Sequence, residues 1–204
     1  SSSKVGSEIV INSYIKSFFN PKDQNEKTKT LIASARAGNV IGGGDWSKDR
    51  IIPDIVRSIF ELNKPAIIRN PNSIRPWQYV LEPLYGYLLL AKKLYEGKKN
   101  FVGPWNFGPN KANFLTVKEL MESALKILKQ GSYIINERGS ERYEMQLLKL
   151  NSNKAKNDLG WRPRLNINQT LKLSFDWYKS FYNKKNILKH TNKQIELFFN
   201  KILK

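Results

Sequence analysis

The positions of the apolar residues predict helices that alternate with short strands. In residues 4–20 they recur every three or four positions until Asn20-Pro21 ends the pattern, which indicates an amphipathic helix. The same reasoning predicts further helices over residues 49–62, 81–95, 116–129, 152–160, 168–182 and 191–203. Short apolar runs predict strands over residues 31–37, 66–69, 104–109 and 134–135. This alternation is typical of an α/β fold.

Local signals mark the ends of several of these helices. Thr116 and Glu119 have the spacing of a capping box, and Ser152 is expected to cap the helix that stops at Gly160. The segment over residues 81–95 is so apolar that we expect its helix to be mostly buried. Its apolar side consists of Leu84, Tyr87, Leu88, Ala91 and Leu94.

The composition excludes several classes of protein. With 40% hydrophobic and 25% charged residues, the chain is not a largely disordered one. The lack of cysteine excludes disulfides and a cysteine nucleophile, and the single histidine, His190, argues against a metal site or a Ser-His-Asp triad. We expect His190 on the surface of a helix. No apolar run approaches the roughly 20 residues that span a bilayer, and no signal peptide is visible, so we expect no membrane partner and a cytoplasmic location.

The net charge of +18 favours an acidic partner, such as a nucleic acid, an anionic membrane or a phosphorylated small molecule. Most basic residues are lysines spread along the whole chain, and Lys, Asn and Ile share codons rich in adenine and thymine, so genome composition explains much of the excess. The chain has no Arg-rich arm, RNP-type strand or zinc finger. A nucleic acid is therefore the less favoured partner. The arginines are more informative, because their planar groups bind phosphate with two hydrogen bonds.

Three clusters combine arginine with Asn, Trp and Gly in predicted loops, where binding residues concentrate. They are residues 36–46, which run into 49–53, residues 68–80, and residues 105–109. A strand that ends in Asn and a glycine-rich turn before a helix can present backbone N–H groups to an anion, although turn geometry alone also explains such glycines. The Gly-x-Gly-x-x-Gly dinucleotide fingerprint is absent from the whole chain.

Together these clusters resemble the nucleotide-sugar dehydratases and epimerases of the extended short-chain dehydrogenase/reductase superfamily. Within the superfamily, the resemblance is strongest to the CDP-glucose 4,6-dehydratase subfamily. The sequence segments that carry it are ARAGNVIGGGDW with DRIIPDIVR, IRNPNSIRPWQYVLEPLYGYLLLA, WNFGP and LKLNSNKAKNDLGWRPR. The resemblance covers residues 1–180. It implies an α/β fold, with the C-terminal part of a Rossmann-like parallel sheet and a smaller, mostly helical substrate-binding domain. Residues 1–48 would be the remaining Rossmann-type elements, and residues 49–204 the substrate-binding part with interleaved Rossmann strands and C-terminal helices.

The start of the chain resembles the end of the family's Tyr-x-x-x-Lys motif, with Lys4 as the lysine. The tyrosine would then fall one position before Ser1. The resemblance thus implies that the glycine-rich NAD loop, the acid/base residues and the catalytic tyrosine precede this chain. It implies an incomplete lyase that is inactive alone.

In this family a bound NAD oxidises the sugar at C4, water leaves from C5 and C6, and the hydride returns to C6, which turns CDP-glucose into CDP-4-keto-6-deoxyglucose. By resemblance, Lys4 is both catalytic and cofactor-binding, because it holds the nicotinamide ribose and lowers the pKa of the tyrosine. Ala37 and Val40 are the other expected NAD contacts. The expected substrate contacts are Asn39, Arg50, Arg69, Arg75 and Asn106.

Three alternatives remain open. An epimerase or reductase of the same superfamily would share the arginines, a basic nucleic-acid-binding module rests on net charge alone, and a degenerate fragment would work with a separate N-terminal polypeptide. The resemblance also implies a homodimer through the helix that contains Lys4. Tyr143, Glu144 and Met145 depart from the family pattern in the loop expected near the nucleotide.

Overall fold

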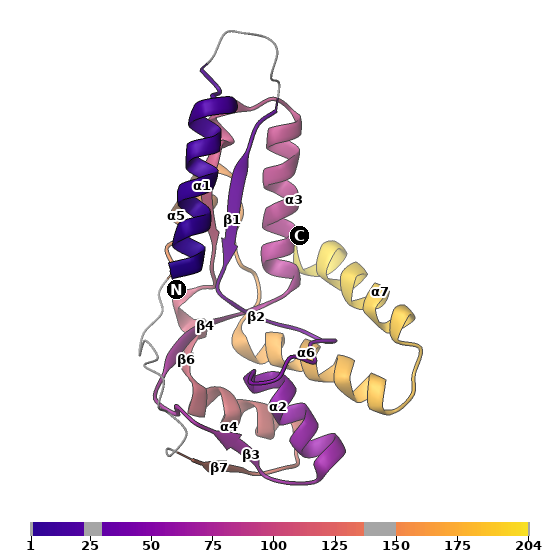
Figure 1. Ribbon diagram of the computed structural model, residues 1–204. Coiled ribbons are helices and arrows are strands. Elements are labelled where there is room, and N and C mark those ends of the chain that lie inside the picture. Colours follow the sequence, from indigo (N-terminus) through magenta and orange to yellow (C-terminus); the bar gives the residue numbers. More distant parts are fainter. Residues whose placement is uncertain (1, 23–29, 137–149, 204) are drawn as a thin grey trace. The chain divides into compact units, whose positions relative to one another are not determined.

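The computed structural model describes residues 2–22, 30–136 and 150–203 (Figure 1). The chain forms two compact units, and it enters each of them three times. The first unit comprises Ser1–Ala37, Pro83–Phe107 and Asn151–Arg162; the second comprises Gly38–Glu82, Gly108–Leu150 and Pro163–Lys204. The chain passes into the second unit after Ala37, inside the stretch 1–48 that the sequence assigned to Rossmann-type elements. That assignment stays a prediction.

The first unit is built around two parallel strands. Strand β1 (Ala33–Ala37) pairs with β5 (Gly103–Phe107) in a register that runs from Ala33 opposite Gly103 to Ala37 opposite Phe107. Parallel strands need a long crossover connection, and part of that connection is α3 (Leu81–Tyr95). Helices α1 (Ser2–Phe18) and α3 run alongside β1 (Figure 1), and α5 (Asn153–Asp158) packs against β5.

Aromatic side chains dominate the core of the first unit. Trp105, Phe107 and Trp161 are each almost fully buried, and the rings of Phe107 and Trp161 meet edge to face with centroids 5.1 Å apart. Gly86 of α3 lies directly against the ring of Phe107, so the helix approaches the strand closely because this position has no side chain. The rest of this core consists of Leu90, Phe101, Ala155 and Leu159.

The second unit contains two small sheets and the remaining helices. In one sheet, β2 (Asn39–Ile41) is parallel to β4 (Ile74–Tyr79), which is antiparallel to β6 (Phe114–Thr116); in the other, β3 (Ala66–Ile68) is parallel to β7 (Tyr133–Ile135). Its α-helices are α2 (Ile51–Arg57), α4 (Val117–Leu128), α6 (Ile167–Tyr182) and α7 (Ile187–Leu197). Helix α2 continues as a π-helix over Ser58–Leu62, and α7 continues as one over Phe198–Ile202. Short 3₁₀ turns lie at Lys99–Phe101 in the first unit and Lys111–Asn113 in the second.

The core of the second unit joins α2, α4 and α6 to the strands. Its fully buried members are Ile55, Val56, Ala66, Leu120, Met121, Ala124, Leu171, Phe175 and Tyr178. Helices α2, α4 and α6 thus each bury one side in a single apolar cluster, as amphipathic helices do.

The structure confirms the α/β alternation and most of the predicted elements. The helix over 81–95 has the predicted ends. The capping box is formed in full, since the Glu119 N–H donates to Thr116 Oγ1 over 3.1 Å and the Thr116 N–H donates to Glu119 Oε2 over 2.8 Å. Among the described residues, no helix combines the length and the apolar character needed to cross a bilayer.

Several predictions about local structure are wrong. Ser152 precedes α5, but its side chain makes no capping bond there. Leu84 and Leu88 are 44% and 62% exposed, so α3 is not buried along the predicted side. His190 lies on a helix, as predicted, but it is partly buried there, with Nδ1 3.2 Å from Ser180 Oγ. Helix α7 begins at Ile187, ahead of the predicted start, because the Asn186 side chain accepts a bond from the Lys189 N–H.

Gly86 and Gly6 provide a matched test of this packing. In Gly86→Ala the new methyl group overlaps the Phe107 ring, so we expect the free energy of unfolding to fall by about 1–3 kcal/mol. In Gly6→Ala, on α1, nothing lies within 4 Å of the new group, so helix propensity raises stability by up to about 1 kcal/mol. Urea unfolding followed by circular dichroism measures both changes. Equal effects of the two substitutions would contradict the close approach of α3 to β5.

Candidate functional site

Two of the predicted site residues lie at one edge of the sheet in the first unit. Ala37 ends β1, and Asn106 stands on β5 opposite Arg36, one step before the pair Ala37 and Phe107. In α/β proteins ligands bind at the carboxyl ends of parallel strands. This edge is therefore where a ligand of the first unit is expected.

The side chain of Asn106 has a fixed orientation and an unused acceptor. Its Nδ2 donates to the backbone oxygen of Asn151 over 3.1 Å. Its Oδ1 is buried and has no hydrogen-bond partner within the described residues. Leaving a buried polar atom unpaired costs about 1–3 kcal/mol, so this atom is suited to accept a bond from a ligand.

Lys4 lies on α1 with its side chain in solvent, one turn before Glu8. Glu8 connects this helix to β1: it accepts a bond from Ser34 Oγ over 2.9 Å and lies 3.5 Å from Nε of Arg36. The position of Lys4 relative to β1 is thus set by polar contacts one turn further along the helix. The role of Lys4 stays a prediction.

Asn39, Val40 and Arg75 lie on neighbouring strands of the second unit. Asn39 and Val40 stand on β2 opposite Trp77 and Gln78 of β4. Arg75 lies two residues before Trp77 on β4; it is only 7% exposed, and its Nη1 donates to the backbone oxygen of Ile74 over 2.9 Å. The three residues therefore share one small sheet.

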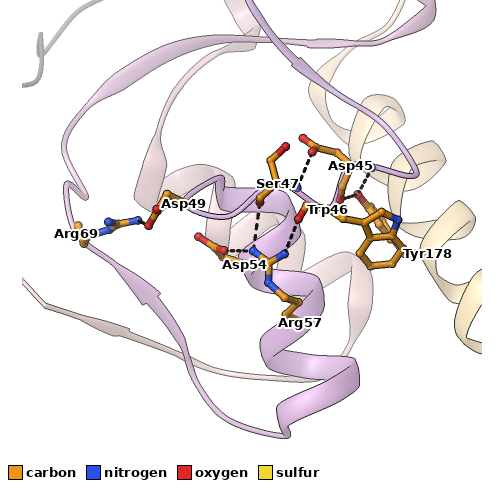
Figure 2. A network of polar contacts seen from close by, with 8 residues as sticks. All are labelled: Asp45, Trp46, Ser47, Asp49, Asp54, Arg57, Arg69 and Tyr178. Carbon is orange, nitrogen blue, oxygen red and sulfur yellow. Dashed lines mark hydrogen bonds and ion pairs between the residues drawn. The ribbon is translucent and has the colours of Figure 1, made fainter.

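Arg50 and Arg69 belong to a second group, in and beside the loop of residues 45–50, here called the Asp45 loop. Arg50 Nη1 lies 3.1 Å from Asp45 Oδ2, and Arg69 Nη2 lies 2.6 Å from Asp49 Oδ1. The second pair brings the end of β3 to the Asp45 loop (Figure 2). Both arginines are largely exposed, so these ion pairs add little stability.

The pKa of Asp45 is held below its ordinary value. Partial burial opposes ionisation, but hydrogen bonds from Ser47 and the neighbouring Arg50 guanidinium outweigh it. Asp45 is therefore ionised at neutral pH and neutralises Arg50. An anionic ligand has to compete with this carboxylate for the guanidinium.

The predicted residues fall into both units. Lys4, Ala37 and Asn106 belong to the first, and Asn39, Val40, Arg50, Arg69 and Arg75 to the second. Tyr143, Glu144 and Met145 lie outside the described residues. In the parts of the chain that the structure describes, no group of three acidic or histidine side chains could hold a metal ion.

The sequence did not single out three residues whose side chains hold the backbone of the second unit: Arg57, Glu82 and Tyr178. Arg57 and Tyr178 hold the backbone of the Asp45 loop (Figure 2). Glu82 is 1% exposed, and its Oε1 accepts bonds from the N–H groups of Arg164 and Leu165 over 2.8 and 2.7 Å. One signal in the sequence could have pointed to two of them, since Arg57 and Glu82 lie inside the segments that carry the family resemblance.

Comparison with known proteins agrees with the resemblance. No protein-family model matches the chain. Over 195 residues, 96% of its length, the chain is 42% identical to CDP-glucose 4,6-dehydratase of Salmonella typhimurium, and the match covers 54% of that protein. The chain is a relative of this dehydratase. It spans about half the length of the curated relative that it matches.

Solved structures show the same fold. UDP-glucuronic acid 4-epimerase of Bacillus cereus, in complex with UDP-glucuronic acid and NAD, superimposes with a TM-score of 0.72 at 19% identity, covering 89% of this chain and 52% of that one. For dTDP-glucose 4,6-dehydratase of Bacillus anthracis, in complex with NAD, the TM-score is 0.67 at 20% identity, with 90% and 53% of the chains covered. These likenesses confirm the predicted α/β fold with Rossmann-type elements.

Glu82 and Glu119 make opposite predictions for the pH dependence of stability. Burial raises the pKa of Glu82, although the two N–H groups that it accepts bonds from oppose this. The contribution of Glu82 to the free energy of unfolding is therefore present below the ordinary pKa of a glutamate and is lost as the pH rises through the raised pKa. The bonds from Thr116 lower the pKa of Glu119, so its contribution is present above its ordinary pKa and is lost as the pH falls.

As the pH rises from roughly 3.5 to roughly 7, the free energy of unfolding of Glu82→Gln is therefore expected to increase relative to that of the unsubstituted chain. That of Glu119→Gln is expected to decrease over the same range. Urea unfolding of the three proteins across this range measures both trends. The free energy of unfolding of each variant is compared with that of the unsubstituted chain at every pH. If this difference changes with pH in the same direction for both variants, burial does not govern the pKa of Glu82.

Proposed function

We propose that the chain is the nucleotide-sugar-binding part of a CDP-glucose 4,6-dehydratase, which converts CDP-glucose to CDP-4-keto-6-deoxyglucose. The observation that carries this proposal is the 42% identity over 195 residues to a protein of that name. The exposed Arg50 and Arg69, in and beside the Asp45 loop, and the buried Arg75 support it, because a diphosphate is best bound by guanidinium groups.

The proposed substrate contacts are Asn39, Arg50, Arg69, Arg75 and Asn106. Each charge-assisted hydrogen bond to a phosphate contributes about 1.5–3 kcal/mol, so two or three arginines supply most of the affinity for a nucleoside diphosphate. The unused Oδ1 of Asn106 suits a hydroxyl or amino donor of the nucleotide part.

NAD is the proposed cofactor, and when bound it supplies a hydride acceptor for the C4 carbon of the sugar. We propose that Lys4, Ala37 and Val40 contact it. The small side chain of Ala37 at the carboxyl end of β1 leaves room for a ligand to approach the backbone. The charge of Lys4 would lower the pKa of a neighbouring tyrosine hydroxyl. The chain is proposed to have no dehydratase activity by itself, and its cytoplasmic location stays a prediction.

A second copy of this chain is the proposed protein partner, through the helix that contains Lys4. Five large apolar side chains of α1 are 55–63% exposed: Val5, Ile9, Val10, Tyr14 and Phe18. Exposed apolar surface of this extent is typical of an interface rather than of a solvated helix.

Ligand binding tests the proposed function directly. Isothermal titration of the purified chain with CDP-glucose and with CDP should show binding, and Arg50→Ala and Arg69→Ala should each weaken it by roughly 10-fold or more. Arg162→Ala is the matched control, because Arg162 is exposed and outside the candidate site. Arg75→Lys, which keeps the buried charge but not the planar group, is expected to weaken binding as well.

Failure of the unsubstituted chain to bind CDP-glucose, or equal affinities of Arg50→Ala and Arg162→Ala, would contradict the proposal. Titration with a single-stranded oligonucleotide tests the alternative that the net charge suggests. Tight binding that falls steeply with salt and is not displaced by CDP would favour a nucleic-acid-binding module.

Sedimentation velocity tests the proposed dimer. Ile9→Glu places a charge among the exposed apolar side chains of α1, so we expect it to convert the dimer to monomer. Ser17→Glu, an exposed polar position on the same helix, should leave the dimer intact. A monomeric unsubstituted chain would contradict the proposed partner.

A further inference from the structure

The Asp45 loop has no helix or strand of its own, although it carries Arg50 and is joined to Arg69. It lies between Gly44 and the start of α2 at Ile51. Gly44 has a φ of 80° and Asp49 a φ of 62°, so the backbone enters the left-handed region near both ends of the loop. Contacts from outside the loop must therefore hold it in one shape.

Tyr178 of α6 supplies the first of these contacts. Its hydroxyl donates to the backbone oxygen of Asp45 over 2.8 Å and accepts from the Asp45 N–H over 3.1 Å (Figure 2). The residue is fully buried, and the pKa of its hydroxyl is raised to about 12, chiefly by burial. The hydroxyl thus keeps the proton that it donates, and its place is set by the core of the second unit.

Arg57, in the last turn of α2, supplies the second contact. Its Nη1 donates to the backbone oxygen of Trp46 over 3.0 Å, and its Nη2 donates to that of Ser47 over 3.2 Å (Figure 2). Nη2 also pairs with the Asp54 carboxylate, which balances the charge. The rigid fork of one guanidinium therefore fixes two consecutive carbonyl groups of the loop.

Aromatic packing supplies a third contact. The Trp46 ring lies 5.4 Å from the ring of Tyr178 and 5.0 Å from that of Phe181. Just before the loop, Gly43 passes so close to Trp177 that any side chain there would overlap the ring. The loop is thus held against α6 by both apolar and polar contacts.

We propose that Tyr178 and Arg57 are positioning residues, which hold the backbone of the Asp45 loop so that Arg50, and Arg69 through Asp49, are already ordered when an anionic ligand binds. The inference rests on the proposed function, in which these two arginines bind the diphosphate. A ligand that meets an ordered loop does not have to offset the entropy of ordering it. Removing the hydroxyl of Tyr178 should therefore weaken diphosphate binding without removing any group that touches the ligand.

The neighbouring Tyr182 provides a matched control. Its ring also lies near Trp46, with centroids 6.2 Å apart, but its hydroxyl donates to Glu61 over 2.6 Å instead of to the loop. Tyr178→Phe and Tyr182→Phe each remove one hydroxyl from the same end of α6. Only the first removes bonds to the backbone that leads to Arg50.

The test titrates the full chain and these variants with CDP and with cytidine, which lacks the phosphates. Tyr178→Phe is expected to bind CDP about 3- to 10-fold more weakly, the cost of ordering one or two side chains on binding. Tyr182→Phe should bind CDP within about 2-fold of the unsubstituted chain, by the same reasoning. Cytidine affinity should change in neither variant. Arg57→Lys, which keeps the charge but cannot span both carbonyls, should weaken CDP binding in the same way.

A background without the two arginines separates positioning from general destabilisation. In Arg50→Ala/Arg69→Ala, adding Tyr178→Phe should not weaken CDP binding further. A further loss in this background, an equal loss of CDP and cytidine affinity, or equal CDP affinities of the Tyr178→Phe and Tyr182→Phe variants would overturn the inference while leaving the proposed function in place. If the unsubstituted chain does not bind CDP, both fall together.

Discussion

Helix α6 is the element on which the second unit depends, because it buries the most side chains against several neighbours. Leu171, Phe175 and Tyr178 are fully buried, and the helix packs against α4, α7, β2 and β4. Burying each such side chain contributes on the order of 1.5–3 kcal/mol. Tyr178 ends this buried run, and its hydroxyl must find polar partners because it is withdrawn from water. The backbone N–H and oxygen of Asp45 are these partners. The packing of α6 in the core therefore also determines the shape of the Asp45 loop.

Each of the three arginines around the Asp45 loop is paired with a carboxylate, although the chain as a whole is strongly basic. Arg50 faces Asp45, Arg69 faces Asp49 and Arg57 faces Asp54. Paired charges project a weaker field than isolated ones, which reduces the attraction of polyanions in general. A compact dianion can replace a carboxylate at close range, where geometry and hydrogen bonding matter more than net charge. This pairing agrees better with the proposed diphosphate ligand than with a nucleic acid.

The sheet of the first unit is short and is made by two distant parts of the chain. Its two strands, β1 and β5, come from segments far apart in the sequence, and their paired register places Ala37 beside Phe107 and Asn106 beside Arg36. The unused acceptor of Asn106 lies on this short sheet, while large apolar side chains of α1 are exposed.

The sequence by itself determined the α/β class, the ends of the helix over 81–95, the capping box at Thr116 and the family resemblance, because each depends on residues a few positions apart or on contiguous words. It missed β2, β4 and β6, because β2 is followed directly by the glycines of residues 42–44, β4 contains Pro76, and β6 runs directly into α4. The tertiary structure alone decided what holds the loop that carries Arg50. Asp45 and Tyr178 are separated by 133 residues, and no local pattern in the chain records a hydrogen bond made across that distance.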